Sequence, residues 1–250
     1  MTKVMLRKIA VLATMMLMNQ AQADAPLIPH QAEYKVRISV VSGRLNTMLR
    51  RTETGYVANH VIRPTGFSKI LVNGSMEVTS DFAIESDGVR PDHYIAIDTI
   101  RDDPKIDLTF DWDSNEVAGT VGDEDVALQL GGIAYDPVSI QYALMHDLLN
   151  QKVNKEYLLF DVDKMRVANV SDVGSKQIKT KAGEFAAIGV RHQKKGSSRV
   201  TTLWCVEELG YLPVIIEQHR NGKLNFRATL VSYSAGEEAS LAASTATSAQ

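Results

Sequence analysis

Strict alternation of apolar and polar side chains constrains this chain more than any other feature. From Tyr34 to Val40 every second residue is apolar, and the residues between them are charged or polar. A period of two puts the two sets on opposite faces of a β-strand. Similar segments recur along the chain, separated by polar turns, which favours an antiparallel sheet over a βαβ fold. The predicted strands are 33–40, 44–51, 55–62, 75–84, 91–101, 105–112, 156–163, 165–171, 175–180, 183–193, 198–206, 212–219 and 224–234.

One helix is predicted between the two groups of strands, from residue 136 to about residue 150. Asp136 is a favourable N-cap and Pro137 is the favoured first helical residue. Its apolar residues recur at helical spacing and need an apolar partner surface, which the sheet supplies. The fold class is therefore mainly β: a curved antiparallel sheet or incomplete β-barrel, with the 136–150 helix across its concave face.

The first 23 residues have the pattern of a secretory signal peptide. Three basic residues precede the apolar run 9–18, and Ala21-Gln22-Ala23 supplies the small residues of a cleavage site near Ala23/Asp24. A spanning helix needs roughly 20 apolar residues, about twice this run, and no later stretch approaches that length. We therefore expect an exported, periplasmic protein without a transmembrane segment after cleavage.

The ends of the chain delimit a single β-rich domain, 24–234. Residues 235–250 are rich in Ala, Ser and Thr and contain no aromatic residue, so we expect a disordered tail. The only cysteine, Cys205, excludes an intramolecular disulfide, and its apolar neighbours predict a buried thiol.

Charge narrows the set of partners. Without the three basic residues of the leader, 24 Lys and Arg face 30 Asp and Glu, a net charge of −6. Nucleic acid binding demands a basic footprint, so nucleic acid is not an expected partner. The same balance argues against broad adhesion to anionic membranes.

Catalytic and metal-binding patterns are missing from the sequence. Asp107 and Asp111 share a face of one predicted strand and could act as an acid/base pair, but solvated carboxylates are the commoner case. The six histidines are dispersed, and neither a nucleophile elbow nor a phosphate-binding loop is present. We expect no catalytic residues, metal or cofactor and no enzyme activity. A hydrolase using Asp107 and Asp111 is kept as an alternative.

Several short motifs occur in a recognisable order. They are Phe110-Asp111-Trp112, Tyr135-Asp136-Pro137-Val138-Ser139, the segment 180–187 around Gly183-Glu184-Phe185, and Thr202-Leu203-Trp204 followed by Gly210-Tyr211-Leu212-Pro213-Val214. In this order the chain resembles the bacterial family of exported proteins called domain of unknown function 3108, over nearly all of the mature chain. Lys181 stands where that family often has proline. The family has no established activity, so the resemblance implies a compartment and a shape. The last hairpin also resembles, more distantly, the LolA and LolB lipoprotein carriers, and this likeness is one of fold.

These observations lead to a functional hypothesis. A curved sheet partly covered by one helix leaves an apolar groove for a lipid, an acyl chain or an extended peptide, as expected of a binding or chaperone-like module. The expected partners are such a hydrophobic ligand or a protein of the cell envelope. An envelope interaction protein without a small ligand is a second alternative, which an apolar patch or a free sheet edge would favour. The candidate lining residues are Phe110, Trp112, Tyr142, Met145, Leu149 and Trp204.

Overall fold

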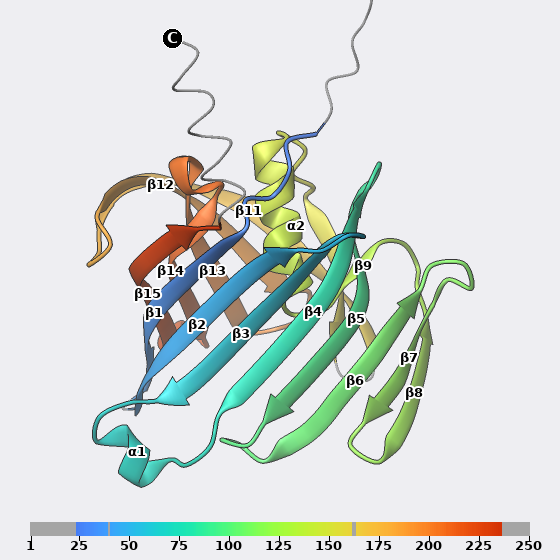
Figure 1. Ribbon diagram of the computed structural model, residues 1–250, viewed down its shortest axis with the longest axis horizontal. Coiled ribbons are helices and arrows are strands. Elements are labelled where there is room, and N and C mark those ends of the chain that lie inside the picture. Colours follow the sequence, from blue (N-terminus) through green and yellow to red (C-terminus); the bar gives the residue numbers. More distant parts are fainter. Residues whose placement is uncertain (1–23, 40, 162–163, 237–250) are drawn as a thin grey trace, which may run out of the picture.

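A computed structural model describes residues 24–39, 41–161 and 164–236, which form one curved, open sheet of fifteen strands with a helix on its inner side (Figure 1). The strand order is β8-β7-β6-β5-β4-β3-β2-β1-β15-β14-β13-β12-β11-β10-β9. All neighbouring strands are antiparallel except β9 and β10, which are parallel. The predicted fold class is confirmed, and the sheet is not closed into a barrel by hydrogen bonds.

The strands and helices have the following bounds. The first half contains β1 (His30–Ile38), β2 (Val41–Arg51), β3 (Tyr56–Pro64), α1 (Ser68–Leu71), β4 (Met76–Glu85), β5 (Gly88–Asp98), β6 (Asp103–Asp111), β7 (Glu116–Val121) and β8 (Glu124–Gln129). The second half contains β9 (Ala134–Tyr135), α2 (Ser139–Leu149), β10 (Glu156–Asp161), β11 (Lys164–Lys179), β12 (Glu184–Lys194), β13 (Arg199–Val206), η1 (Glu207–Leu209), β14 (Leu212–Arg220) and β15 (Lys223–Ala235).

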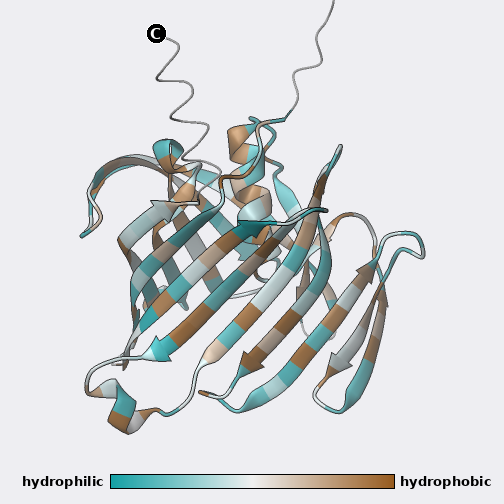
Figure 2. Ribbon diagram, viewed as in Figure 1, coloured by the Kyte–Doolittle hydropathy of each residue, from teal (hydrophilic) through white to brown (hydrophobic). Residues whose placement is uncertain are grey.

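The alternating apolar and polar residues of the strands lie on the inner and outer faces of the sheet, respectively. On β1 the side chains of Ala32, Tyr34 and Val36 are buried, while Lys35 and Arg37 are exposed. The same pattern continues through the neighbouring strands, and the inward set forms one apolar core with α2. Figure 2 shows the resulting bands of hydrophobic and hydrophilic residues along the strands.

Helix α2 lies inside the curved sheet, against β4 and β5. Asp136 stands just before it, as predicted for a cap: Oδ1 accepts hydrogen bonds from the backbone N–H groups of Val138 (2.7 Å) and Ser139 (2.9 Å). Oδ2 accepts another from Ser80 on β4 at 2.7 Å. The cap therefore also ties the start of the helix to the sheet. Eight of the eleven residues of α2 are buried, so the helix is a core element rather than a one-sided cover.

The two ends of this assembly differ. At one end, called the closed end below, residues 24–29 cross the C-terminal turn of α2: Asn150 hydrogen-bonds the backbone N–H (2.7 Å) and carbonyl (3.2 Å) of Ala25. The buried Leu27 accepts a hydrogen bond through its carbonyl from Tyr56. The opposite end, called the open end, carries α1 and the turns β1–β2, β5–β6, β12–β13 and β14–β15 (Figure 1).

Some predicted boundaries differ from the structure. Strands β7 and β8 were not predicted, because Gly119 and a run of acidic residues weaken their alternation. The two strands predicted at 165–171 and 175–180 are one strand, β11, interrupted by a bulge between Asp172 and Ser175. The hairpin signal Asn221-Gly222 is confirmed, and both residues have the positive φ of a tight hairpin turn (51° and 74°). The predicted signal peptide lies outside the described residues. So does the predicted tail 235–250 apart from its first two residues, of which Ala235 ends β15.

No helix in the described ranges is both long and apolar enough to cross a bilayer.

Candidate functional site

A cavity of about 750 Å³ lies between α2 and the open end of the sheet. The start of α2 roofs it with Pro137, Ile140, Gln141 and Leu144. Its walls come from β4–β6 on one side and from β10–β14 on the other. The cavity extends to exposed residues at the strand ends, among them Arg101, Asp103, Arg199 and Arg220, so it opens there. Its volume is within the usual range of ligand sites, about 300–1,000 Å³.

The wall made by β12, β13 and β14 changes in polarity along the strands. Nearest α2, Leu203 and Ile216 face each other across β13 and β14. One inward position closer to the open end is a neutral polar row of His192, Thr201 and Gln218. The last inward positions are Lys194, Arg199 and Arg220. Since alternate residues of a strand share a face, these three rows line the same wall, from apolar to basic.

Two arginines at the end of this wall stand directly opposite each other. Arg199 and Arg220 are cross-strand partners, and both are exposed. Like charges at such positions destabilise a sheet. Neither guanidinium forms an ion pair with a carboxylate of residues 24–39, 41–161 or 164–236. By contrast, Asp161 pairs with Lys194 (2.6 Å) and with Arg166 (2.7 Å) beside them. The arginine pair is therefore a place of uncompensated positive charge at the cavity opening.

The opposite wall, made by β4–β6, is likewise apolar near α2 and polar near the open end. Tyr94 is buried, and Ala96 and Ile106 are half-buried beside the cavity. Closer to the open end, Asp98 accepts hydrogen bonds from the backbone N–H groups of Ile100 and Arg101 and from Arg101 Nε at 2.7 Å. The acidic side chain here is thus fully engaged by its own turn.

His192 is the titratable side chain within the polar row. Burial, and secondly the charge of Lys194, lower its pKa to about 4, so the ring is neutral at pH 7. Its Nδ1 atom is buried and has no hydrogen-bond partner in the described part of the chain. A buried unpartnered nitrogen is unusual in a native structure. It offers a polar contact to a molecule that enters the cavity.

On the other side of α2 the interior is filled by aromatic side chains. The Tyr142 hydroxyl lies 3.0 Å from His60 Nε2, and its ring stacks on Phe82 at a centroid distance of 5.4 Å. Burial, and secondly His30, lower the pKa of His60 to about 4. These contacts pack this side of α2 against the sheet.

The structure separates the six predicted lining residues from the cavity. None of them is among its lining residues, and together they do not form one site. Tyr142 and Met145 are fully buried, and Leu149 is half-buried at the closed end of α2. Phe110 stacks on Trp112 at 6.2 Å, and Trp112 donates a hydrogen bond to the Pro91 carbonyl at 2.8 Å. Their role in binding stays a prediction.

Trp204 lies on the outer face of the sheet. It is the cross-strand partner of Gly189, and a Cβ at Gly189 would come within 2.8 Å of its ring. Lys176 Nζ lies 3.5 Å from the ring centroid on the other side. The neighbouring Leu203 lines the cavity instead. The alternation of β13 was visible in the sequence. The sequence did not show which face of the strand lies on the concave side of the sheet.

The residues that do line the cavity had weaker signals. Ile140 and Leu144 belong to the predicted helix, but the helix residues predicted to line the groove were Tyr142, Met145 and Leu149. Arg199 and Arg220 flank a predicted hairpin and look like ordinary turn charges until the strand register pairs them.

The carboxylates considered for a hydrolase are engaged elsewhere. Asp107 lies 2.8 Å from Lys105 Nζ and 2.8 Å from His93 Nε2, and these hydrogen bonds lower its pKa. Hydrogen bonds from the turn residues Ser114 and Asp113 lower the pKa of Asp111. Neither residue lines the cavity, and a general acid needs a raised pKa. The geometry gives the hydrolase alternative no support.

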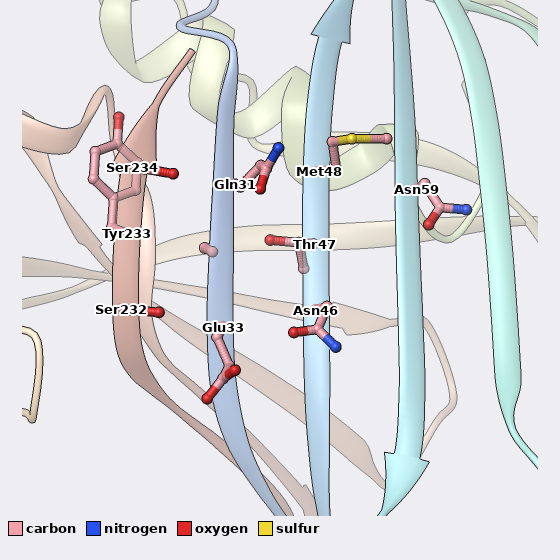
Figure 3. Close-up of a pocket in the computed structure, with 10 residues that line it drawn as sticks. Gln31, Glu33, Asn46, Thr47, Met48, Asn59, Ser232, Tyr233 and Ser234 are labelled. Carbon is pink, nitrogen blue, oxygen red and sulfur yellow. The ribbon is translucent and has the colours of Figure 1, made fainter.

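A second depression lies on the outer face, over β15, β1, β2 and β3 (Figure 3). It is a groove of about 460 Å³ lined mainly by polar side chains such as Gln31, Asn46 and Asn59. Glu33 pairs there with Arg44 (3.1 Å), and Asn59 donates to Thr79 (3.0 Å). Among the described residues, no group of three or more His, Cys, Asp and Glu side chains could hold a metal ion.

Comparison with known proteins agrees with this architecture. A family model described as "Protein of unknown function (DUF3108)" matches residues 31–229. A beta-barrel-like protein of domain of unknown function DUF1849 from Brucella abortus has a similar structure, with a TM-score of 0.57, 13% identity and coverage of 85% of this chain and 100% of that chain. MucB aligns with a TM-score of 0.35 and 11% identity, over 84% of this chain and 54% of its own. No curated protein matches the sequence significantly.

Proposed function

This chain belongs to the DUF3108 family of proteins of unknown function, and from the geometry of its cavity we propose that it is an exported, periplasmic binding module for an amphiphile. The ligand has an acyl chain and an anionic head group. The acyl chain lies under α2, between Leu144 and Ile216, and the head group lies at Arg199 and Arg220. The protein carries this molecule without altering it.

One observation carries the proposal: the wall of β12–β14 runs from apolar through neutral polar to basic along its inward positions. This order matches the order of groups in an acyl chain with an anionic head. An arginine pair without carboxylate partners binds phosphate or carboxylate oxygens well, because guanidinium donors fit them in a bidentate way. An anion between Arg199 and Arg220 also removes their mutual repulsion.

The apolar part of the cavity supports the same ligand. Leu144, Leu159 and Leu203 are buried around a space that water fills poorly, since water there finds few hydrogen-bond partners. Burying apolar surface of a chain is worth about 0.8 kcal/mol per methylene group. A chain of several methylene groups therefore binds with useful affinity without any further polar contact.

Native mass spectrometry of the protein purified from the periplasm, followed by lipid extraction, tests the proposal. A stoichiometric lipid is expected on the wild-type protein. It is expected to be lost in Ile216→Asp, which places a carboxylate in the apolar wall, and reduced in the double variant Arg199→Ser/Arg220→Ser. Arg50→Ser/Arg51→Ser removes two exposed arginines from the closed end and is the matched control.

A clean mass for the wild-type protein, with no uptake of added fatty acid or phospholipid, would overturn the proposal. Equal lipid content in Ile216→Asp and wild type, with both proteins shown to be folded by circular dichroism, would mean that the ligand binds outside the cavity.

The alternative of an envelope interaction protein rests on the free edge of the sheet. Strand β8 has no partner on its outer side in the described residues, so it offers unpaired backbone groups. Its first two residues, Glu124 and Asp125, are exposed and acidic, which discourages strand addition. Cross-linking at this edge in cells would reveal a strand partner, and a clean result there leaves the cavity as the functional site.

A further inference from the structure

Exposed apolar side chains gather at the open end of the molecule. Six large hydrophobic residues of the described chain are exposed, and five of them lie at this end: Ile38, Phe67, Ile70, Ile97 and Leu224. The two most exposed are Phe67 (73%) and Ile70 (77%), in and beside α1. Only Val153 lies at the closed end. Scattered exposed apolar residues need no explanation, but a cluster at one end does.

The position of Phe67 and Ile70 is fixed by the loop around them. Ser68, which stands between them in the chain, is buried, and its hydroxyl accepts a hydrogen bond from Ser42 N–H on β2 at 2.9 Å. The Thr65 N–H donates to the Ser42 carbonyl at 3.0 Å. Residues three apart on a helical turn share a face. The loop is therefore held against β2, while the exposed side chains of Phe67 and Ile70 share its outer face.

Four turns of the open end are joined to each other by hydrogen bonds. Beyond the contacts of α1 with β2, Ser39 N–H donates to the Asn225 carbonyl (3.3 Å), and Asn221 N–H donates to the Ser198 carbonyl (3.2 Å). The joined turns form one continuous edge, which we call the basic–apolar arc. It comprises residues 37–39, 41–42, 63–75, 194–199 and 219–225.

The charge of this arc is mainly positive. These segments contain the basic residues Arg37, Arg63, Lys69, Lys194, Lys195, Arg199, Arg220 and Lys223, and no Asp or Glu. Two of these eight pair with carboxylates beside the arc, Arg63 with Glu77 (2.7 Å) and Lys194 with Asp161 (2.6 Å). The other turns of the open end are different: Asp102 and Asp103 follow β5, and Asp123 and Glu124 join β7 to β8. In a chain with an excess of acidic residues, this edge thus combines eight cations with four of the exposed apolar side chains, Ile38, Phe67, Ile70 and Leu224.

We propose that the basic–apolar arc docks on an anionic lipid bilayer, with Phe67 and Ile70 inserted among the head groups and the basic side chains over the lipid phosphates. Apolar side chains combined with cations are what an interfacial anchor requires. The arc includes Arg199 and Arg220, so docking places the cavity opening at the membrane surface. The inference that lipid passes through this opening rests on the proposed function, whereas docking itself does not.

Vesicle sedimentation of the purified protein tests the docking. The wild-type protein is expected to sediment with vesicles of phosphatidylethanolamine and phosphatidylglycerol, less with rising salt, and not with vesicles of phosphatidylcholine alone. The double variant Phe67→Ser/Ile70→Ser is expected to bind the anionic vesicles at least about tenfold more weakly. The matched control Val153→Ser removes an exposed apolar residue from the closed end and is expected to bind as the wild type does.

Absence of wild-type binding to the anionic vesicles, or equal binding by Phe67→Ser/Ile70→Ser, would overturn the docking. So would a dimer in light scattering that this variant converts to a monomer, because the arc would then be an interface between two copies. Lipid content is measured on the same samples. A protein that contains bound lipid but does not sediment with vesicles overturns the docking alone. A protein without bound lipid that does sediment with vesicles overturns the proposed function alone.

Discussion

The two ends of the curved sheet are built from the same strands but differ in whether their polar side chains have partners. At the closed end Asn150 hydrogen-bonds both the backbone N–H and the carbonyl of Ala25. At the start of α2 the carboxylate of Asp136 accepts hydrogen bonds from Val138, Ser139 and Ser80. At the open end Arg199 and Arg220 face each other, and within residues 24–39, 41–161 and 164–236 neither pairs with a carboxylate. The first two arrangements stabilise the fold, and the third opposes it. Unfavourable charge that persists beside a cavity is an indication of binding.

The difference also lies in how space is filled. Tyr142, Phe82 and His60 close the interior beside one side of α2. On the other side of the same helix, Ile140 and Leu144 face a cavity of about 750 Å³. One helix therefore serves as core on one side and as the roof of a site on the other. Substitutions at the closed end are expected to change stability, and those at the open end to change binding.

The largest expected effect is at the cap of α2. Asp136→Ala leaves two backbone N–H groups and the Ser80 hydroxyl without their acceptor, so the free energy of unfolding is expected to fall by about 3 kcal/mol. Urea denaturation followed by circular dichroism measures it. A loss below about 0.5 kcal/mol, the range of ordinary surface changes, would show that α2 does not depend on this cap.

Asp136→Asn sharpens the same test. An amide keeps the acceptor for the backbone groups and donates to Ser80, so its effect is expected to be much smaller. Burial raises the pKa of Asp136, so the folded state binds a proton more tightly than the unfolded state. The carboxylate therefore lowers stability as pH rises through the carboxyl range, and Asp136→Asn is expected to gain relative to wild type in that direction.

The next effect is a loss of stability in mild acid. Burial lowers the pKa of both His60 and His192 to about 4 from an unfolded value of 6.5. Each therefore contributes stability above pH 6.5 that is lost as pH falls towards 4, on the order of 2–3 kcal/mol per ring. His192→Gln is expected to remove its share of this slope in urea denaturation across that pH range. An unchanged slope would contradict the burial of the ring.

A smaller effect has the opposite sign. Arg199→Ser/Arg220→Ser removes two like charges from adjacent strands, so the protein without ligand is expected to gain about 0.5 kcal/mol. Fatty acid binding, followed by calorimetry, is expected to weaken by about tenfold, or 1.4 kcal/mol. Loss of both stability and binding would mean that the pair supports the fold rather than the ligand.

The smallest effect is expected at Trp204, on the outer face. Trp204→Phe keeps an aromatic ring over Gly189 and weakens the contact with Lys176, which is worth about 0.5–1 kcal/mol at an exposed site. Lipid content is expected to be unchanged, because the residue is outside the cavity. A reduced lipid content in this variant would mean that Trp204 takes part in lipid binding.

The sequence predicted the fold better than the site. Alternation, the Asp136 cap and the Asn221-Gly222 turn each depend on neighbouring residues, so the mainly β fold, the helix and the last hairpin were predictable. The site depends on which residues of distant strands meet. The pairing of Arg199 with Arg220 follows from the register of β13 and β14, and the choice of Leu203 over Trp204 follows from the direction of curvature. Neither is a local property of the chain.

The most direct test of the amphiphile site is a crystal structure of the protein loaded with a fatty acid that carries bromine on its last carbon. The anomalous signal of bromine is expected beside Ile140 and Leu144, under α2, with the carboxylate at Arg199 and Arg220. Bromine at the arginine pair, or in the outer groove over β15, β1, β2 and β3, would contradict the proposed orientation and the proposed site.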